Sequence, residues 1–429
     1  MDKKVNAFLA MHNFPVHLNI DSVVDAVLCD MEAGLTKSGL KAGEEMIPTY
    51  ALPPKNKPRN ETVIVIDAGG TNFRSCLVTF DAEGKATISE MEKTRMPGVE
   101  RELSKKEFFD QFASNLEHLK NKATKIGFCF SYPMQITDDG DGILNGFSKE
   151  VKAPEVVGSK IGACLSDALV EHGWKRPERI SLLNDTVAAL LAGASQSGAG
   201  FEYSSYIGFI LGTGMNLAYI QPEMAGLKKQ IVVCESGKFN KLIASDFDRE
   251  LDSHSTAPGS FALEKKCSGA YLGTAAFFAI KAACADGLFS DAVTKSLSAL
   301  DSLTLIEMDK FLHAPLSTDS ILGKLLSDCK AEREDYDTLY LICDAIVERS
   351  ARYSAAILAA AVIKSEEGKS PVNPVCVVCN GTTFYKTNYI KERVQGYLEK
   401  ILREEHSLFV RLVSVEDDIT IGTAISGLV

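Results

Sequence analysis

Long apolar runs are missing from this chain of 429 residues. The longest covers residues 355–363, nine residues, whereas a helix that crosses a bilayer needs about 20. The N-terminal stretch contains two lysines, but they are not followed by the apolar segment of roughly 7–15 residues that defines a secretory signal. We therefore expect a cytoplasmic protein that has no membrane span.

An excess of basic residues is also missing. The chain has 46 lysines and arginines against 57 aspartates and glutamates, which gives a formal net charge of −11. Proteins that wrap nucleic acid usually show a basic excess or a basic stripe. Short basic clusters occur at 55–59 and 228–229, where solvated loops are the better interpretation. We expect no nucleic-acid partner.

Several common catalytic motifs are absent. None of the seven histidines stands in an HxxxH or HExxH arrangement, and the chain has no GxSxG elbow and no Walker A sequence. The eleven cysteines are odd in number and lack a framework spacing, which favours buried, reduced thiols. Cys376 and Cys379 have CxxC spacing on a predicted strand, where residues three apart point to opposite faces, so we expect no shared metal.

What the chain does have is two similar β-hairpins. A β-branched run at 62–67 ends in Asp-Ala-Gly-Gly-Thr and resumes at 72–80, and a second run at 206–211 passes through Gly-Thr-Gly into 216–220. The two turns lie about 145 positions apart, and each is followed by alternating strands and helices. This pattern predicts an α/β protein with two similarly built lobes, whose facing glycine turns could clamp a nucleotide.

The remaining elements follow from hydrophobic periodicity. The helix at 20–38 is expected to be capped by Asp21 or Ser22, and the segment at 48–60, rich in proline and lysine, is the best linker candidate. Strands are expected at 125–130, 180–183 and 375–378, and further helices at 107–122, 155–172, 271–285, 288–299, 335–364, 388–404 and 419–429.

Three groups of residues could carry chemistry, and each has a plainer explanation. Asp67, at the end of a strand, could hold Mg²⁺ through water beside the Gly-Gly turn, although taken alone this is an ordinary hairpin. Asp185 follows a strand of the predicted α/β sheet, where ligand sites lie, but it could simply cap the next helix. Glu235 and Glu264, taken alone, would be called surface carboxylates.

Taken together and in order, these segments resemble the hexokinases of the sugar kinase, heat-shock and actin superfamily over nearly the whole length. The matching segments are 45–50 (EMIPTY), 66–74 (IDAGGTNFR), 130–133 (FSYP), 146–149 (GFSK), 183–186 (LNDT), 212–216 (GTGMN), 235–239 (ESGKF), 247–252 (FDRELD), Pro258 with Gly259, Glu264, and 380–383 (NGTT).

The resemblance implies a fold and a division of the chain. The fold would be α/β with two lobes of the actin-like ATPase, or ribonuclease H-like, type and a cleft between them. The small lobe would comprise residues 61–183 and 416–429. The large lobe would comprise 1–60 and 184–415.

The resemblance also implies an activity: ATP-dependent phosphorylation of the 6-hydroxyl of a hexose, with glucose favoured, as in the first step of glycolysis. The partners would be the hexose, ATP and Mg²⁺, and the protein a monomer or homodimer. A kinase for another hexose or an amino sugar is the alternative within enzymes. A non-catalytic sugar sensor and an actin- or chaperone-like ATPase are rivals from other classes.

The same resemblance assigns roles to residues. Asp185 would be the general base, and Lys149 would bridge the sugar and the γ-phosphate. The sugar would be bound by Ser131, Ser148, Lys149, Asn184, Asp185, Asn216, Glu235 and Glu264. The nucleotide and its Mg²⁺, the latter held by Asp67, would be bound by Asp67, Gly69, Gly70, Thr71, Asn72, Arg74, Gly212, Thr213, Gly214, Gly381 and Thr382.

Two departures from the family pattern concern the sugar pocket. The family usually has Trp-Thr-Lys-Gly-Phe where this chain has Gly-Phe-Ser-Lys-Glu-Val at 146–151. Ser148 keeps a hydroxyl and Lys149 keeps the cation, but the wall of the pocket changes. Glu235 is followed by Ser236 where the family often has Trp. Both changes bear on the choice of sugar more than on the reaction.

Overall fold

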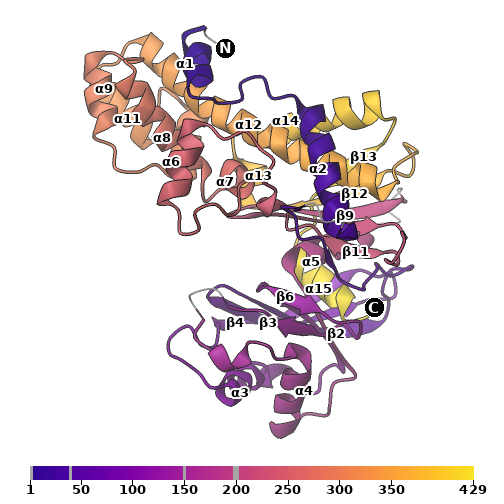
Figure 1. Cartoon of the computed structure of the whole chain (residues 1–429). Helices are drawn as coiled ribbons and strands as arrows, with labels where there is room; N and C mark the ends of the chain where they lie inside the picture. Colours follow the sequence, from indigo (N-terminus) through magenta and orange to yellow (C-terminus); the bar gives the residue numbers. More distant parts are fainter. Residues whose placement is uncertain (1–2, 38–40, 148–150, 197–201) are drawn as a thin grey trace.

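A computed structural model describes residues 3–37, 41–147, 151–196 and 202–429 of the chain. It shows two lobes, with two helices lying side by side between them (Figure 1). Each lobe is organised around one mixed β-sheet. In the described residues, no helix has the length and apolar character needed to span a membrane.

The small-lobe sheet has five strands in the order β4-β3-β2-β5-β8. Its strands are β2 (Glu61–Gly69), β3 (Asn72–Phe80), β4 (Ala86–Arg95), β5 (Lys125–Phe130) and β8 (Arg179–Leu183). The first three form an antiparallel meander, and β5 and β8 are added in parallel. Helices α3 (Lys105–Asn115) and α4 (Ile161–Glu171) pack against each other below this sheet (Figure 1).

The large-lobe sheet repeats this pattern with one extra strand, in the order β1-β11-β10-β9-β12-β13. The strands are β1 (Ile47–Pro48), β9 (Ser205–Leu211), β10 (Met215–Gln221), β11 (Gln230–Val233), β12 (Val375–Asn380) and β13 (Val410–Val413). Strands β11, β10 and β9 form the antiparallel meander, and β12 and β13 follow in parallel. The two hairpins predicted from the sequence are therefore confirmed.

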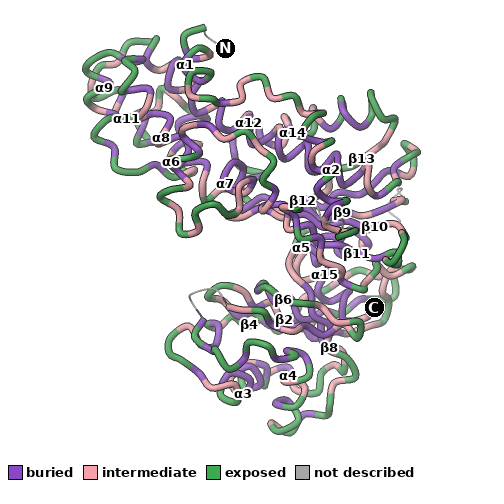
Figure 2. Tube along the Cα trace, in the orientation of Figure 1, coloured by how far each residue is buried: buried purple, intermediate pink, exposed green. Residues whose placement is uncertain are grey.

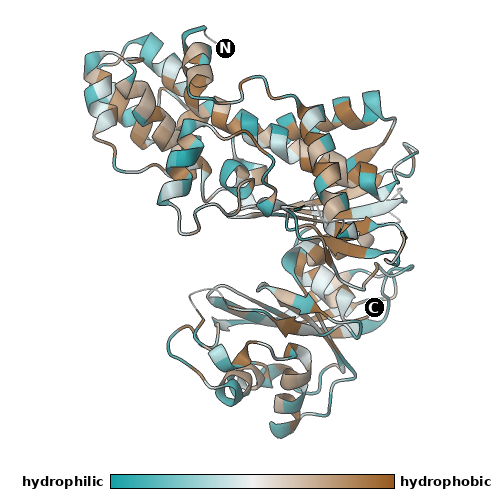
Figure 3. Cartoon of the chain, viewed as in Figure 1, coloured by the Kyte–Doolittle hydropathy of each residue, from teal (hydrophilic) through white to brown (hydrophobic). Residues whose placement is uncertain are grey.

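Most of the helices belong to the large lobe. They are α1 (Lys3–Met11), α2 (Ile20–Thr36), α6 (Asp246–His254), α7 (Glu264–Cys267), α8 (Leu272–Ala285), α9 (Asp291–Ser298), α10 (Leu305–His313), α11 (Ile321–Asp328), α12 (Arg333–Ser365), α13 (Thr382–Lys386) and α14 (Ile390–Leu398). Several carry hydrophobic and hydrophilic residues along the same helix (Figure 3). The long α12 lies through the centre of this lobe and is mostly buried (Figure 2).

Shorter elements complete the chain. They are β6 (Met134–Ile136), β7 (Gly142–Leu144), the 3₁₀ turns η1 (Glu117–Leu119), η2 (Pro154–Val156) and η3 (Ser236–Lys238), and the π-helical turn η4 (Glu399–Glu405). The remaining helices, α5 (Asp185–Ala194) and α15 (Asp418–Ser426), lie between the lobes (Figure 1).

Helices α5 and α15 pack closely because a glycine stands at their contact. A Cβ at Gly422 would come within 1.8 Å of the Ala188 carbonyl oxygen. One hydrophobic cluster includes small-lobe residues such as Val65, α5 residues such as Val187, and Ile425 of α15. The two sheets fall within the predicted lobe ranges, although the exact lobe boundaries stay a prediction.

Several predicted helix ends were wrong. The cap of α2 is Asn19, whose side chain accepts from the Ser22 amide, and not Asp21 or Ser22. The helix predicted at 107–122 begins at Lys105 and ends at Asn115, and the one predicted at 155–172 begins at Ile161. Helix α3 begins two residues earlier than predicted because a Ser104–Glu107 capping box satisfies the unpaired amides of its first turn. The apolar periodicity, on which the prediction relied, begins only after this cap.

The later helices also differ from their predicted bounds. The helix predicted at 288–299 begins only at Asp291, and the one predicted at 388–404 begins at Ile390 and passes into the π-helical turn after Leu398. Cys376 and Cys379 behave as expected on a strand. They are buried in different hydrophobic clusters, on opposite faces of the sheet, and both thiols are free.

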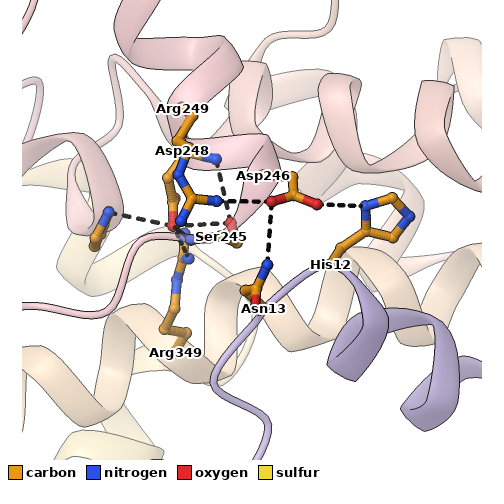
Figure 4. Close-up of polar contacts among 8 residues, drawn as sticks. His12, Asn13, Ser245, Asp246, Asp248, Arg249 and Arg349 are labelled. Atoms are coloured by element: carbon orange, nitrogen blue, oxygen red, sulfur yellow. Dashed lines mark hydrogen bonds and ion pairs between the residues drawn. The ribbon is translucent and has the colours of Figure 1, made fainter.

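A buried ion-pair cluster joins α6 to α12 (Figure 4). The Asp248 carboxylate accepts from Arg349 at 2.8 Å and lies 3.2 Å from the Lys266 ammonium, and all three side chains are at most 6% exposed. Burial alone raises the pKa of Asp248, but the charges of Arg349 and Lys266 outweigh it and hold that pKa well below its ordinary value. Nearby, His12 and Asn13 bond Asp246 and attach the N-terminal segment.

We expect Asp248→Ala to lower the free energy of unfolding by about 3–5 kcal/mol, because it leaves two buried cations without their carboxylate. Asp246→Ala is the matched control: this neighbour is half-exposed, so its loss should cost less than about 1 kcal/mol. Denaturant titration of both variants measures the difference. Equal midpoints for the two variants would contradict the assignment. Since the folded-state pKa of Asp248 is lowered, its contribution should be lost only as the pH falls below about 4.

Candidate active site

A cleft of about 720 Å³ lies between the lobes and is lined by residues of both. Its lining includes every described residue that the sequence assigned to sugar binding: Ser131, Asn184, Asp185, Asn216, Glu235 and Glu264. Ser148 and Lys149, the other two candidates, lie outside the described residues. The tertiary structure thus gathers segments that are far apart in the chain around one cavity.

Asp185 stands where β8 ends and α5 begins. Asn184 is the N-cap of α5, since its side-chain oxygen accepts from the Val187 amide at 2.9 Å, so the alternative in which Asp185 is the cap is wrong. The carboxylate of Asp185 accepts from the Thr186 hydroxyl at 3.1 Å. Burial raises the pKa of Asp185 to about 6, with hydrogen bonds from Thr186 opposing the rise and the charges of Glu235 and Asp67 adding to it.

Glu235 is held in an unusual backbone conformation at the end of β11. Its φ is +53°, in the left-handed region that costs most residues free energy and that clusters at functional sites. The Asn216 amide donates to one carboxylate oxygen at 2.8 Å, and the Lys238 ammonium lies 3.7 Å from the other. The Asn216 and Glu235 side chains, predicted separately, are therefore direct partners.

Glu264, at the start of α7, anchors the second glycine turn. Its carboxylate accepts from the Met215 amide at 2.9 Å, next to Gly214. Burial raises the pKa of Glu264, the Met215 hydrogen bond opposes the rise, and the charge of Glu235 adds to it. Glu235 and Glu264 are thus half-buried carboxylates of the cleft and not surface residues.

The first glycine turn closes the β2–β3 hairpin. Gly69 pairs with Asn72, leaving Gly70 and Thr71 as the loop. Gly70 has a φ of +56° with open space where a Cβ would stand, and its carbonyl accepts from the Tyr132 hydroxyl at 2.9 Å. Such a turn offers backbone amides without side-chain obstruction, as phosphate binding requires.

Asp67 lies at the end of β2, beside this turn. Arg74, directly across the hairpin, donates to its carboxylate at 3.2 Å. Burial raises the pKa of Asp67, and the charge and hydrogen bond of Arg74 oppose the rise. In the described residues, no group of three or more histidines, cysteines or carboxylates is placed to hold a metal ion by itself.

The second glycine turn, at 212–214, packs in the large lobe against a third one, which is formed by Gly381 after β12. The Gly212 carbonyl accepts from the Gly269 amide and from the Thr383 hydroxyl, both at 2.8 Å. Gly381 has a φ of +116°, and a Cβ there would lie 2.1 Å from the Leu211 carbonyl oxygen. Thr213, in the loop after β9, and Thr382, the first residue of α13 after β12, therefore lie on adjoining segments.

The structure also brings in residues that the sequence analysis did not single out. Lys238, Glu45 and Phe261 also line the cleft, and Lys238 bonds Glu45 at 2.6 Å. Asp418, at the start of α15, accepts from the Asn380 amide beside the third turn. Lys238 and Glu45 lie within segments that carried the resemblance, so their position in those motifs was an available signal.

Comparison with known proteins identifies one family for this chain. Two family models, both described as hexokinase, match residues 7–195 and 206–429. A rice (Oryza sativa subsp. japonica) protein named hexokinase-4, chloroplastic, is 30% identical over 94% of this chain and 84% of its own length. Hexokinase-1 of Schizosaccharomyces pombe is 28% identical over 94% of this chain and 86% of its own length.

Solved structures show the same fold. A Schistosoma mansoni hexokinase complexed with glucose covers the whole chain with a TM-score of 0.76 at 23% identity, and 99% of its own chain is matched. A second hexokinase crystal structure gives a TM-score of 0.82 at 22% identity, with both chains covered completely. The two-lobe, actin-like α/β architecture predicted from the sequence is confirmed, and the chain belongs to the hexokinase family.

Proposed function

We propose that this protein transfers the γ-phosphoryl group of ATP to the 6-hydroxyl of a hexose, glucose in the first place, giving hexose 6-phosphate and ADP. Family membership supports phosphorylation of a hexose in general. The observation that carries the proposal is that Asp185 shares one cleft with the Asn216–Glu235 pair and Glu264. A base and a set of hydroxyl-binding acceptors are what this reaction needs from the protein.

Asp185 is the proposed general base. With a pKa of about 6 it is mostly ionised at neutral pH, yet basic enough to accept the hydroxyl proton as the new O–P bond forms. Its place at the first turn of α5 fixes the carboxylate at the carboxyl edge of the small-lobe sheet, where α/β proteins bind ligands. Lys149, the proposed bridge to the γ-phosphate, lies outside the described residues.

The sugar is proposed to lie against Asn184, Asn216, Glu235 and Glu264, with Ser131 on the facing small lobe. Sugar hydroxyls are good donors, and an ionised acceptor roughly doubles the strength of a hydrogen bond. The left-handed backbone of Glu235 and its bond from Asn216 hold this carboxylate before the sugar arrives, so less rotamer freedom is lost on binding.

The glycine turns fit a nucleotide. Gly70 leaves open space where any other residue would place a Cβ, and Thr71, Asn72, Thr213 and Thr382 lie in or beside the turns. Mg²⁺ supplies charge neutralisation on the phosphates when bound. Asp67 would hold this ion through water, since Asp67 alone does not form a protein cage. Such an arrangement suits Mg²⁺, which keeps several waters and takes further ligands from substrate phosphates.

Water must be excluded, because its oxygen competes with the sugar hydroxyl. The cleft is bounded by two lobes joined at α5 and α15, so closure over a full-sized sugar would exclude water and complete the site. A kinase for another hexose or an amino sugar remains the alternative on this fold. Cytoplasmic location and a monomeric or homodimeric state also remain proposals.

Asp185→Ala should lower kcat by several orders of magnitude while largely retaining sugar binding, because the base acts chiefly in the transition state. Steady-state kinetics with ATP and a panel of hexoses, together with calorimetric binding of glucose, measures both quantities. Since the base works ionised and its pKa is about 6, kcat of the unchanged protein should fall as the pH drops through 6. A variant that keeps most of its kcat would exclude Asp185 as the base.

Glu235→Gln should raise KM for glucose about tenfold or more, because a charge-assisted hydrogen bond typically contributes about 1.5–3 kcal/mol. Glu366→Gln, at the exposed C-cap of α12, is a matched control outside the cleft lining and should leave KM unchanged. Unchanged kinetics of the Glu235 variant with glucose, mannose and fructose would remove this residue from the pocket.

Glucose without ATP should bring the lobes together, so the radius of gyration from small-angle scattering should fall slightly. A five-carbon analogue lacking the 6-hydroxymethyl group should stimulate ATP hydrolysis, because it closes the cleft partway and leaves room for water. Asp185→Ala should abolish that stimulated hydrolysis. A glucose-insensitive scattering profile and no stimulated hydrolysis would mean that water is excluded without lobe closure.

A further inference from the structure

Lys238 lies on the sugar side of the cleft among three carboxylates. Its ammonium is 2.6 Å from the Glu45 carboxylate and 3.7 Å from that of Glu235, and its charge acts on Glu264 as well. The centroid of the Phe261 ring lies 5.7 Å away, within cation–π range. A cation held by this many partners has a defined position in the pocket.

The backbone explains why Lys238 and Glu235 face the same space. The left-handed φ of Glu235 starts the 3₁₀ turn η3, in which the Lys238 amide donates to the Glu235 carbonyl at 2.9 Å. This turn brings Lys238 back beside Glu235, so that its ammonium lies 3.7 Å from the Glu235 carboxylate. Each is just under 30% exposed, so solvent screens their charges only in part.

The charges around the sugar position are mostly negative. Among described residues of the cleft lining, the anionic side chains are Glu45 ahead of β1, Asp138 after β6, Asp185 on α5, Glu235 at η3 and Glu264 on α7. The cationic groups are Arg179, at the start of β8 in the small lobe, and Lys238. Lys265, which follows Glu264, bonds Asp252 and the Ala257 carbonyl instead.

Such a set of acceptors binds a neutral hexose through its hydroxyls, but it attracts a hexose that carries a protonated amino group even more strongly. We propose that Lys238 is a specificity-determining residue, which offsets the negative charge of Glu235 and Glu264 and so favours a neutral hexose over a protonated amino hexose. This inference rests on the proposed function, since it takes these two glutamates as the groups that bind the sugar.

The test is calorimetric binding of glucose and of 2-amino-2-deoxyglucose to the full chain without nucleotide, at pH 6.5 and pH 8.5. In Lys238→Met, affinity for the amino sugar relative to glucose should rise about tenfold over the unchanged protein at pH 6.5. The rise should largely vanish at pH 8.5, where an amine with a pKa near that of an α-amino group is neutral. Lys238→Gln is a second variant for the same measurement if the Lys238→Met protein does not fold.

The direction of this pH effect separates it from titration of the cleft. Asp185, with a pKa of about 6, and Glu264, whose pKa burial raises, both gain negative charge as the pH rises. Their ionisation therefore strengthens the binding of a cation as the pH rises. The expected effect of Lys238→Met has the opposite direction, since the gain in relative affinity for the amino sugar is lost at the higher pH. Glu45, Glu235, Asp138, Lys238 and Arg179 also face the cleft, and measuring each variant against the unchanged protein at both pH values cancels contributions common to the two proteins.

Two control variants separate charge from packing. Lys238→Arg keeps the cation, so its affinity for the amino sugar relative to glucose should equal that of the unchanged protein. Glu45→Gln breaks the 2.6 Å ion pair but leaves Lys238 beside Glu235, so the relative affinity for the amino sugar should not rise. If Glu45→Gln reproduces the effect of Lys238→Met, Lys238 acts by holding the segment before β1, and the proposal fails.

Other outcomes are equally decisive. The proposal would be overturned if the affinity for the amino sugar relative to glucose were unchanged in Lys238→Met and Lys238→Gln. It would also be overturned if the rise in this relative affinity persisted in full at pH 8.5. Because binding is measured without phosphoryl transfer, a protein that binds both sugars but phosphorylates neither would overturn the proposed function and still test Lys238. A protein that binds no hexose would overturn both.

Discussion

The contact between α5 and α15 is the constraint on which the site depends. Gly422 brings the α15 backbone against the Ala188 carbonyl so closely that no side chain could be added there. The same α5 begins with the Asn184 cap and Asp185, so the helix that lies between the lobes also carries the proposed base. The proposed closure of the lobes about this contact would therefore be coupled to the placement of the carboxylate through one element.

Charge in the cleft is the second constraint. Asp185, Glu235 and Glu264 line one half-buried space. Burial raises the pKa values of Asp185 and Glu264, and the charge of Glu235 adds to the rise in both. Hydrogen bonds from Asn216, Met215 and Thr186 keep the three carboxylates in place. A site of this kind suits a ligand rich in neutral donors, and the nearby Lys238 ammonium reduces its attraction for cations.

Local signals allowed much of the fold to be predicted. The two hairpins and the long α12 follow from alternation, glycine turns and helical periodicity, which depend on residues close together in the chain. Helix ends were less predictable, as Asn19 in place of Asp21 shows, because neighbouring side chains compete for the same orphan amides. The ordered motifs around 67–74, 183–186 and 212–216 were sufficient to indicate the family and the candidate residues.

Tertiary structure alone decided which of those candidates meet. Asn184 and Asp185 both could cap α5, and the backbone at the end of β8 selects Asn184, which leaves Asp185 in the cleft. Glu45 and Lys238 are 193 positions apart and pair because β1, only two residues long, adds to β11 and forms the edge of the sheet. Contacts of this range depend on how sheets and lobes pack, so no local pattern in the sequence could specify them.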